Sequence, residues 1–284
     1  MKLSTTNLIL SPNASIDLQL HTTFSDGTWL PDELIDYLAR EQFGLVAITD
    51  HDRVDTVVAL QQLALEKHLP ILVAAEMSAS WQGGITDVLC FGFDPAPNAL
   101  SDLTRDVLQR QQENTREVYE NLLQKGYTFP QHPNALPGIL EKPSAQQPKE
   151  LATLLKSTGE QSAGKIVWEV GCTFVTNDIA AIVEASNRSG AVCLLAHPGR
   201  KDGFITYDVD LLDKLRREAP IDGLEVYYPA HTPKQTTMFL DYAQKHDLLI
   251  SSGSDSHGPD KPPIKYPARL SRALLERMGI LIAQ

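Results

Sequence analysis

The sequence predicts an α/β fold in which βα units surround a parallel sheet. Short runs rich in β-branched and other apolar residues alternate with amphipathic stretches through much of the 284-residue chain. Apolar residues make up 42% and charged residues 21% of the chain, a balance that excludes disordered and fibrous classes. The length suits either two domains or one large α/β barrel.

Seven apolar runs have the length and composition of strands, and the stretches between them have helical periodicity. Pro31, followed by Asp32 and Glu33, begins the first helix, because proline suits the first turn and acidic side chains stabilise the positive helix end. The expected strands are Ile16–Leu20, Leu45–Thr49, Ile71–Ala75, Val88–Phe93, Ala191–Ala196, Leu224–Tyr227 and Leu248–Ser252. Further helices are expected at about 55–67, 100–125, 178–189, 208–218, 233–246 and 270–277.

One region interrupts this alternation. The stretch from Pro130 to Lys165 is rich in proline, which prevents long regular elements. We therefore expect a barrel domain over residues 1–95 and 190–284, and an inserted helical and looped subdomain over residues 96–189. A decorated loop is the alternative interpretation of the insertion.

The charge balance limits the partners of the protein. The chain has 25 Lys and Arg against 36 Asp and Glu, so its formal net charge is −11. Binding along extended duplex nucleic acid needs a basic face, which this composition does not favour. Phosphate chemistry would need cations from another source, such as bound metal ions.

Targeting signals and paired cysteines are not evident. The N-terminal segment lacks the pattern of a secretory signal, and no apolar run approaches the roughly 18 residues of a membrane span, so we expect a cytoplasmic protein with no membrane partner. Cys90, Cys172 and Cys193 show no metal-binding or disulfide spacing and are expected to be buried thiols.

Imidazole and carboxylate side chains follow the expected strands. In a parallel barrel the carboxyl ends of the strands meet at one face, so these side chains would share a pocket. Nitrogen and oxygen ligands of this kind bind Zn, Mn or Fe, and their number favours two or three ions over one. The candidate ligands are His21, Asp26, His51, Glu76, His197, Asp255 and His257 at strand ends, with Asp87 at the start of the fourth strand.

Four segments resemble the signature blocks of the polymerase and histidinol phosphatase (PHP) domain family. They are Asp17–Gly27, Ile48–Asp52, Leu194–Arg200 and Gly253–Gly258, and the likeness covers about residues 15–94 and 178–260. One block alone would be weak, but the combination and order are highly specific. The branch that it resembles contains stand-alone phosphoesterases acting on nucleotides and small nucleic-acid ends.

This resemblance implies a distorted (βα)7 barrel whose helical and looped insertion caps the C-terminal face. It also implies two or three divalent ions (Mn, Zn, Fe or Mg) and hydrolysis of a phosphate ester by a metal-bound hydroxide. The seven strand-end ligands fall on the metal positions of the family, and Glu76 matches the position that bridges two ions. Gln19 and Asp87 stand where the family usually has histidine, so we expect Mn or Mg to be preferred over Zn there.

Two further residues are candidates for contacts with the substrate. Arg200 matches a phosphate-holding position of the family, and a guanidinium group suits phosphate because it donates two parallel hydrogen bonds. His231, in the loop after the Leu224–Tyr227 strand, is the candidate catalytic residue that binds substrate or protonates the leaving group. A surface arginine and a solvated loop histidine are the alternatives.

The expected function is that of a metal-dependent phosphoric ester hydrolase whose partner is a small phosphorylated molecule, either a nucleotide or a short oligonucleotide. A catalytically weakened metal- or nucleotide-binding scaffold is one alternative, and Gln19 is the residue that favours it. A zinc amidohydrolase is another, disfavoured by the order of the blocks and by the absence of an evident bridging lysine at a strand end.

Overall fold

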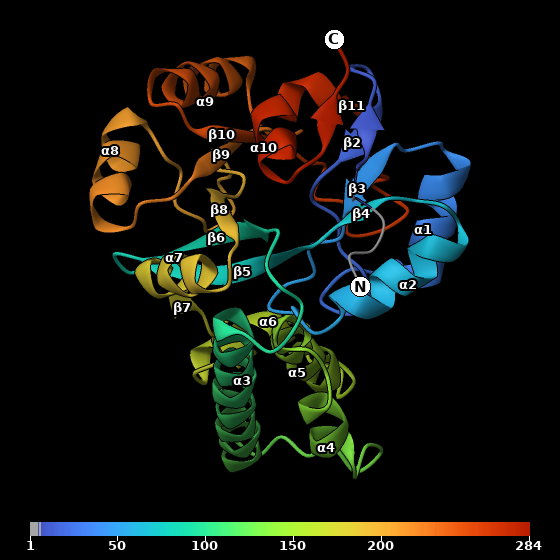
Figure 1. Ribbon diagram of the computed structural model, residues 1–284. Coiled ribbons are helices and arrows are strands. Elements are labelled where there is room, and N and C mark those ends of the chain that lie inside the picture. Colours follow the sequence, from blue (N-terminus) through green and yellow to red (C-terminus); the bar gives the residue numbers. More distant parts are fainter. Residues whose placement is uncertain (1–4, 6) are drawn as a thin grey trace. The chain divides into compact units, whose positions relative to one another are not determined.

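The computed structural model describes residue 5 and residues 7–284 (Figure 1). The N-terminal segment is predicted to carry no secretory signal, and residues 1–4 and 6 of this segment lie outside the described residues. The chain divides into two compact units, one formed by residues 1–103 with 177–284 and the other by residues 104–176. The second unit lies within the stretch 96–189 expected as an insertion, and its expected capping of a barrel face stays a prediction.

The first unit is a mixed α/β fold. Within its described residues, a six-stranded sheet has the order β10-β9-β8-β6-β5-β7, a four-stranded sheet has the order β11-β2-β3-β4, and β1 pairs with β12. The strands are β1 (Ile9–Leu10), β2 (Ser15–Asp17), β3 (Leu45–Ala47), β4 (Ile71–Leu72), β5 (Ala74–Trp81), β6 (Gly84–Phe91), β7 (Asn177–Asp178), β8 (Val192–Leu195), β9 (Gly223–Tyr227), β10 (Leu249–Ser252), β11 (Tyr266–Pro267) and β12 (Leu281–Ile282).

Helices cover these sheets, with α1 and α2 beside the four-stranded sheet and α9 against β9 (Figure 1). Helix α1 begins at Pro31 and buries Leu34, Ile35 and Leu38, as its periodicity predicts. Helix α9 begins with a capping box between Thr232 and Gln235. The helices that belong to the first unit are α1 (Pro31–Arg40), α2 (Val57–Glu66), α7 (Ile179–Arg188), α8 (Val209–Glu218), α9 (Pro233–Lys245), the 3-10 helix η2 (Ala268–Ser271) and α10 (Arg272–Arg277).

The expectation of a purely parallel sheet is wrong at β6. Strands β5 and β6 form an antiparallel hairpin through the turn residues Gln82 and Gly83, whose φ angles of 50° and 79° suit a two-residue hairpin turn. Strand β6 also pairs antiparallel with β8. Because of this direction, Asp87 lies beside the carboxyl end of β8, where its carbonyl accepts a hydrogen bond from the Ala196 amide at 3.0 Å.

The second unit contains more helix than expected. Helix α3 (Ala99–Gln124) continues into it, followed by α4 (Ala135–Leu140), the 3-10 helix η1 (Ser144–Gln146), α5 (Gln147–Lys156) and α6 (Ala163–Glu169). The proline-rich stretch still forms short helices, because Pro137 and Pro148 lie in the first turns of α4 and α5, where a helix loses no hydrogen bond to proline. Val118, Leu151 and Val167 belong to the core of this unit.

Two expectations about composition can be compared with the structure. Cys90, Cys172 and Cys193 are buried and unpaired, as predicted. In the part of the chain that the structure describes, none of the helices combines the length and the apolar character that crossing a membrane would require.

Candidate metal centre

The carboxylate of Glu76 lies at the centre of the candidate site. Glu76 is fully buried in β5, where its amide donates to the Thr49 carbonyl at 3.1 Å and its own carbonyl accepts from the Asp52 amide at 2.8 Å. Its Oε2 lies 2.9 Å from His21 Nε2, and its Oε1 lies 3.1 Å from His197 Nε2. The backbone therefore fixes a carboxylate between imidazoles.

Glu76 does not end its strand as the sequence analysis expects. Strand β5 continues to Trp81, and Glu76 instead forms an isolated bridge with His51 beside the end of β3. His51 Nε2 lies 3.9 Å from Glu76 Oε2. Gln19 also points at this carboxylate, and its Nε2 donates to Glu76 Oε2 at 2.9 Å.

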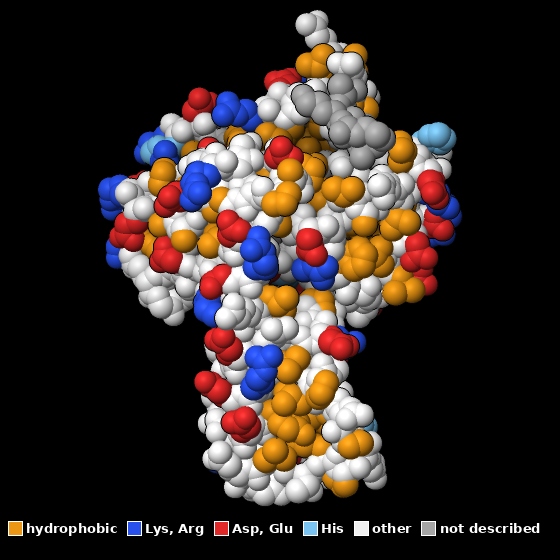
Figure 2. Space-filling model, turned by 60° about the horizontal axis from the view of Figure 1, so that its bottom comes forward, with side chains coloured by type: hydrophobic (Ala, Val, Ile, Leu, Met, Phe, Trp, Pro, Cys, Tyr) orange, Lys and Arg blue, Asp and Glu red, His pale blue; other side chains and the backbone are white. Residues whose placement is uncertain are grey.

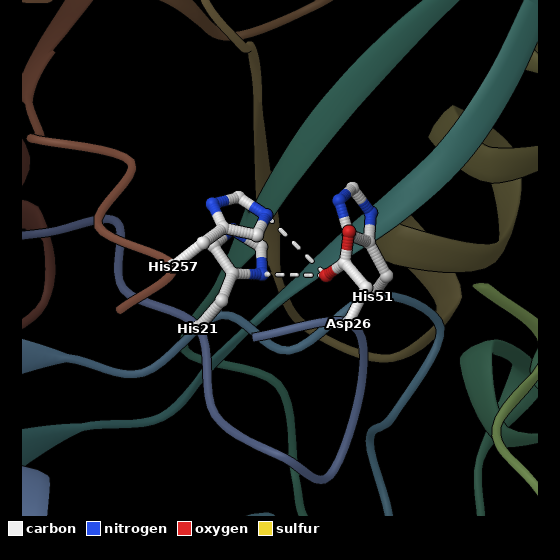
Figure 3. Close-up of side chains that lie close together, drawn as sticks. All are labelled: His21, Asp26, His51 and His257. Carbon is white, nitrogen blue, oxygen red and sulfur yellow. Dashed lines mark ion pairs between the residues drawn. The ribbon is translucent and has the colours of Figure 1, made fainter. Parts of the chain in front are cut away.

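A second group of donors surrounds Asp26. Its Oδ1 lies 3.3 Å from His257 Nε2 and 3.9 Å from His21 Nδ1 (Figure 3). The rings of His21 and His257 stack with centroids 4.1 Å apart, and His51 lies on the other side of the Asp26 carboxylate in this view (Figure 3). Donor atoms of His21, Asp26, His51 and His257 all lie within 4.8 Å of one another.

Two further groups share residues with the first. Donor atoms of His21, Glu76 and Asp255 lie within 4.8 Å of one another, as do those of His51, Glu76 and Asp87. Asp87 Oδ2 is also 3.6 Å from His197 Nε2. The structure therefore brings together all of the candidate ligands from the sequence, namely His21, Asp26, His51, Glu76, Asp87, His197, Asp255 and His257.

Buried acids outside this set hold the surrounding loops. Asp50 accepts hydrogen bonds from the Thr22 amide at 2.7 Å and from the hydroxyls of Thr22 and Ser25, both at 2.8 Å. Asp17 accepts from the amides of Ser254 and Ile264, both at 2.9 Å. These contacts fix the loops that carry His21, Asp26 and Asp255.

Glu225 is a buried acid that the sequence analysis missed. Its Oε2 accepts a hydrogen bond from the His197 amide at 2.9 Å. Gly253 leaves room for it, since a Cβ at Gly253 would lie 2.5 Å from Glu225 Oε1. The available signal was an acidic residue inside the apolar run Leu224–Tyr227, because such a group needs a polar partner.

The electrostatics of the cluster are those of an acid-rich buried site. Burial alone would raise the pKa of Glu76, but the charge of His51 and hydrogen bonds from His197 and His21 hold this pKa well below its usual value. Burial would lower the pKa of His21, yet hydrogen bonds to Asp255 and Glu76 raise it well above its usual value. Burial and the charge of Glu76 raise the pKa of Asp87.

The residues fit divalent cations. Buried carboxylates are costly without positive charge nearby, and a metal ion would supply that charge. Among the described residues, His21 Nδ1, His51 Nδ1 and Asp87 Oδ2 are buried without a hydrogen-bond partner. Imidazole nitrogens together with carboxylate oxygens form a ligand set that suits Zn, Mn or Fe.

Arg200 lies beside this cluster. Its Nη1 is 3.7 Å from Asp255 Oδ2, and its guanidinium lies over the Phe204 ring, 4.1 Å from the centroid. About a quarter of the side chain (27%) is exposed, so Arg200 can reach both the cluster and a ligand from solvent.

His231 is placed differently from the catalytic role expected. Its Nε2 accepts a hydrogen bond from the Gly199 amide at 3.0 Å, and its Nδ1 lies 3.0 Å from the Val226 carbonyl. A carbonyl can only accept a hydrogen bond, so Nδ1 carries the proton. Nε2 accepts a hydrogen bond and therefore carries none, so the ring is neutral. Burial lowers the pKa of His231 to about 4. Both nitrogens are committed to the backbone, so His231 positions the loop that carries Arg200.

No family model matches the chain, but comparisons with known proteins found similar sequences and similar structures. The chain is 28% identical over 277 residues to a 3′,5′-nucleoside bisphosphate phosphatase of Chromobacterium violaceum, covering 89% of this chain and 95% of that protein. It is 25% identical over 252 residues to a 5′-3′ exoribonuclease of Haemophilus influenzae, covering 86% and 90%.

Solved structures share the fold. A Bifidobacterium adolescentis protein whose proposed activity is that of a metal-dependent phosphoesterase matches with a TM-score of 0.76 and 24% identity, covering 94% of this chain and 98% of that one. A two-domain Bacteroides vulgatus protein containing a predicted PHP-like metal-dependent phosphoesterase matches with a TM-score of 0.50 and 12% identity, covering 96% and 66%. The relatives and the shared fold agree with the resemblance to the PHP family. Gln19 and Asp87 are the departures from the histidines that the family resemblance leads us to expect.

Proposed function

We propose that this protein hydrolyses phosphate esters of nucleotides or of short nucleic-acid ends, with two or three divalent metal ions bound by the cluster around Glu76. The observation that carries the proposal is the buried Glu76 carboxylate, which has His21 and His197 within 3.1 Å of its two oxygens. A carboxylate in this position can bridge two ions.

The residues divide into three overlapping ligand groups. His21, Glu76 and Asp255 would hold one ion. His51, Glu76 and Asp87, with His197 beside them, would hold a second ion, while Asp26 and His257 complete a third group with His21 and His51. When bound, divalent ions would supply positive charge that stabilises phosphoryl oxygens, and they would lower the pKa of a bound water molecule.

The protein's own side chains would orient the substrate. Arg200 would donate to phosphoryl oxygens from a guanidinium group that lies over the Phe204 ring. The Gly199 amide is held by His231, which fixes the loop between His197 and Arg200. These contacts would hold a phosphate beside the cluster around Glu76, and they would need no change in the protonation of His231.

A small substrate is supported by the relatives and by charge. The two relatives described above act on a nucleoside bisphosphate and on RNA, as their names state. The face shown in Figure 2 carries Lys and Arg interspersed with Asp and Glu, rather than a continuous basic stripe. With a formal net charge of −11, this distribution disfavours binding along an extended duplex.

We further propose that the first unit contains the distorted (βα)7 barrel implied by the family resemblance. Strand pairing and two isolated bridges, Leu20 with Ser256 and His51 with Glu76, support a closed ring. The ring would run through β2, β3, β5, β6, β8, β9 and β10 and return to β2.

The function is tested by a phosphate-release screen. The full-length protein is loaded separately with Mn, Mg or Zn and incubated with mononucleotides, 3′,5′-bisphosphonucleotides and short 5′-phosphorylated oligonucleotides. We expect release from at least one nucleotide class and none after His51→Ala substitution. If no substrate is hydrolysed with any metal, hydrolysis is excluded.

A catalytically weakened scaffold is the second candidate, and the contact between Gln19 and Glu76 favours it. Gln19 Nε2 donates to Glu76 Oε2, so a neutral amide stands where the family usually supplies a histidine ligand. A scaffold would bind metal or nucleotide in the same screen but release no phosphate.

A further inference from the structure

Two hydrogen-bond donors from different loops meet the same oxygen at the edge of the cluster. Tyr228, directly after β9, donates its hydroxyl to Asp255 Oδ2 at 3.4 Å. Arg200, in the loop after β8, has Nη1 3.7 Å from that same oxygen. The Phe204 ring supports the guanidinium from one side. Strand order places β8 and β9 side by side, so the two donors are neighbours by topology.

The two carboxylate oxygens of Asp255 have different neighbours. Its Oδ1 lies 3.2 Å from His21 Nε2 and 3.5 Å from His257 Nδ1, inside the candidate metal cluster. Its Oδ2 lies on the side of Arg200 and Tyr228. Beside the candidate metal ligands, a negatively charged oxygen is therefore near both the guanidinium group of Arg200 and the phenol of Tyr228.

We propose that Tyr228 is a substrate-contacting residue whose hydroxyl donates a hydrogen bond to a non-bridging phosphoryl oxygen beside Arg200. This inference rests on the proposed function and adds a residue that the sequence motifs do not include. Arg200 alone would supply charge, whereas Tyr228 would fix the orientation of the phosphoryl group with a second donor from another loop.

The surroundings of Tyr228 suit a fixed, protonated donor. Its ring packs against His197, with centroids 5.4 Å apart, and against the edge of His231 at 5.1 Å. A phenol keeps its proton at neutral pH, so the Tyr228 hydroxyl can donate a hydrogen bond. The Tyr228 residue as a whole is only partly buried.

The test is binding of inorganic phosphate to the full-length, Mn-loaded protein by isothermal titration calorimetry. Hydrogen bonds to charged groups contribute enough that Tyr228→Phe should weaken phosphate binding about 10- to 100-fold. Tyr227→Phe is the matched control, because Tyr227 is the adjacent tyrosine and packs against the core of the first unit. The control should bind phosphate as the wild type does.

A double-mutant cycle of Tyr228→Phe with Arg200→Ala shows whether the two side chains contact the same phosphoryl group or affect phosphate affinity independently. If both side chains contact the same phosphoryl group, the losses in phosphate affinity will not add. Metal content and melting temperature are measured for every variant, and both should stay at the wild-type value in Tyr228→Phe.

The outcomes distinguish the inference from the function on which it rests. Equal phosphate affinity of Tyr228→Phe and wild type overturns the role of Tyr228 while leaving the phosphoesterase proposal intact. Loss of bound metal or a lowered melting temperature in Tyr228→Phe would also overturn it, because the hydroxyl would then act only by supporting Asp255. Metal-loaded wild type that binds no phosphate would instead contradict the proposed function itself.

Discussion

Replacing His231 by alanine removes two backbone contacts at once. The ring joins the Gly199 amide and the Val226 carbonyl, each at 3.0 Å, and only 9% of the residue is exposed. Leaving one buried polar group without a partner costs about 1–3 kcal/mol, so two such groups cost about 2–6 kcal/mol of unfolding free energy. We expect His231→Ala to lower the free energy of unfolding by this amount in urea titrations.

The same substitution should affect substrate binding more than bond cleavage. Gly199 lies between His197 and Arg200, so a loosened loop misplaces the guanidinium of Arg200 but leaves Glu76, in β5, in place. We expect KM for the substrate found in the screen to rise while metal content stays constant. Thr237→Ala on α9 is a control, because its hydroxyl bonds only within its own helix, to the Pro233 carbonyl.

The pH dependence of this residue has a defined sign. The pKa of His231 is lowered to about 4 in the folded protein, against about 6.5 in an unfolded chain. Between these values the unfolded chain binds more protons. The stabilisation by His231 is therefore complete above about pH 6.5 and is lost as the pH falls toward 4. Nitrogen NMR should show a neutral ring protonated on Nδ1 at pH 6.

One result would refute this reasoning about His231. In this result, the His231→Ala variant unfolds like the wild type but has a lower kcat with KM unchanged, and the His231 ring of the wild-type protein titrates near pH 7. His231 would then be the proton donor expected from the sequence. The backbone contacts to Gly199 and Val226 would then not describe its role.

Three further predictions concern the metal ligands. Gln19→His should raise Zn affinity in calorimetric titrations, because Gln19 Nε2 already lies 2.9 Å from Glu76 Oε2, and unchanged affinity would mean that this position does not face an ion. Asp87→Asn should lower the number of Mn ions bound in elemental analysis, since it removes one anionic donor, and equal stoichiometry would remove Asp87 from the ligand set. Removal of divalent ions with a chelator should lower the melting temperature, because ligand at 100 times its dissociation constant stabilises by about 2.7 kcal/mol, and an unchanged melting temperature would contradict metal binding to the folded state.

Much of the fold could be predicted because local patterns coincide with tertiary structure in the first unit. Helix α1 begins at Pro31 as the proline and acidic residues predict, and strand β9 covers the expected Leu224–Tyr227 run. The direction of β6 could not be predicted by the alternation, because the two-residue turn at Gln82 and Gly83 replaces a crossover helix. That turn was the overlooked signal.

The candidate site could be predicted in its members but not in its contacts. His21, His51 and His197 could be predicted because each follows the end of an expected strand within two residues. Glu225 was missed because it lies within an apolar run, and its partner, the His197 amide, is a backbone group. The role of His231 also depends on backbone atoms of Gly199 and Val226, which no side-chain pattern specifies.

The most direct measurement of the central claim is the metal content of protein purified without chelator. We predict two or more equivalents of divalent metal in the wild type. Glu76→Ala should lose most of this metal and all turnover while still unfolding cooperatively, because the loss of a ligand removes metal from a preformed site. Glu66→Ala, an exposed residue at the end of α2, is the matched control. Wild-type protein that holds less than one equivalent after Mn supplementation, or Glu76→Ala with unchanged metal content, would contradict the account.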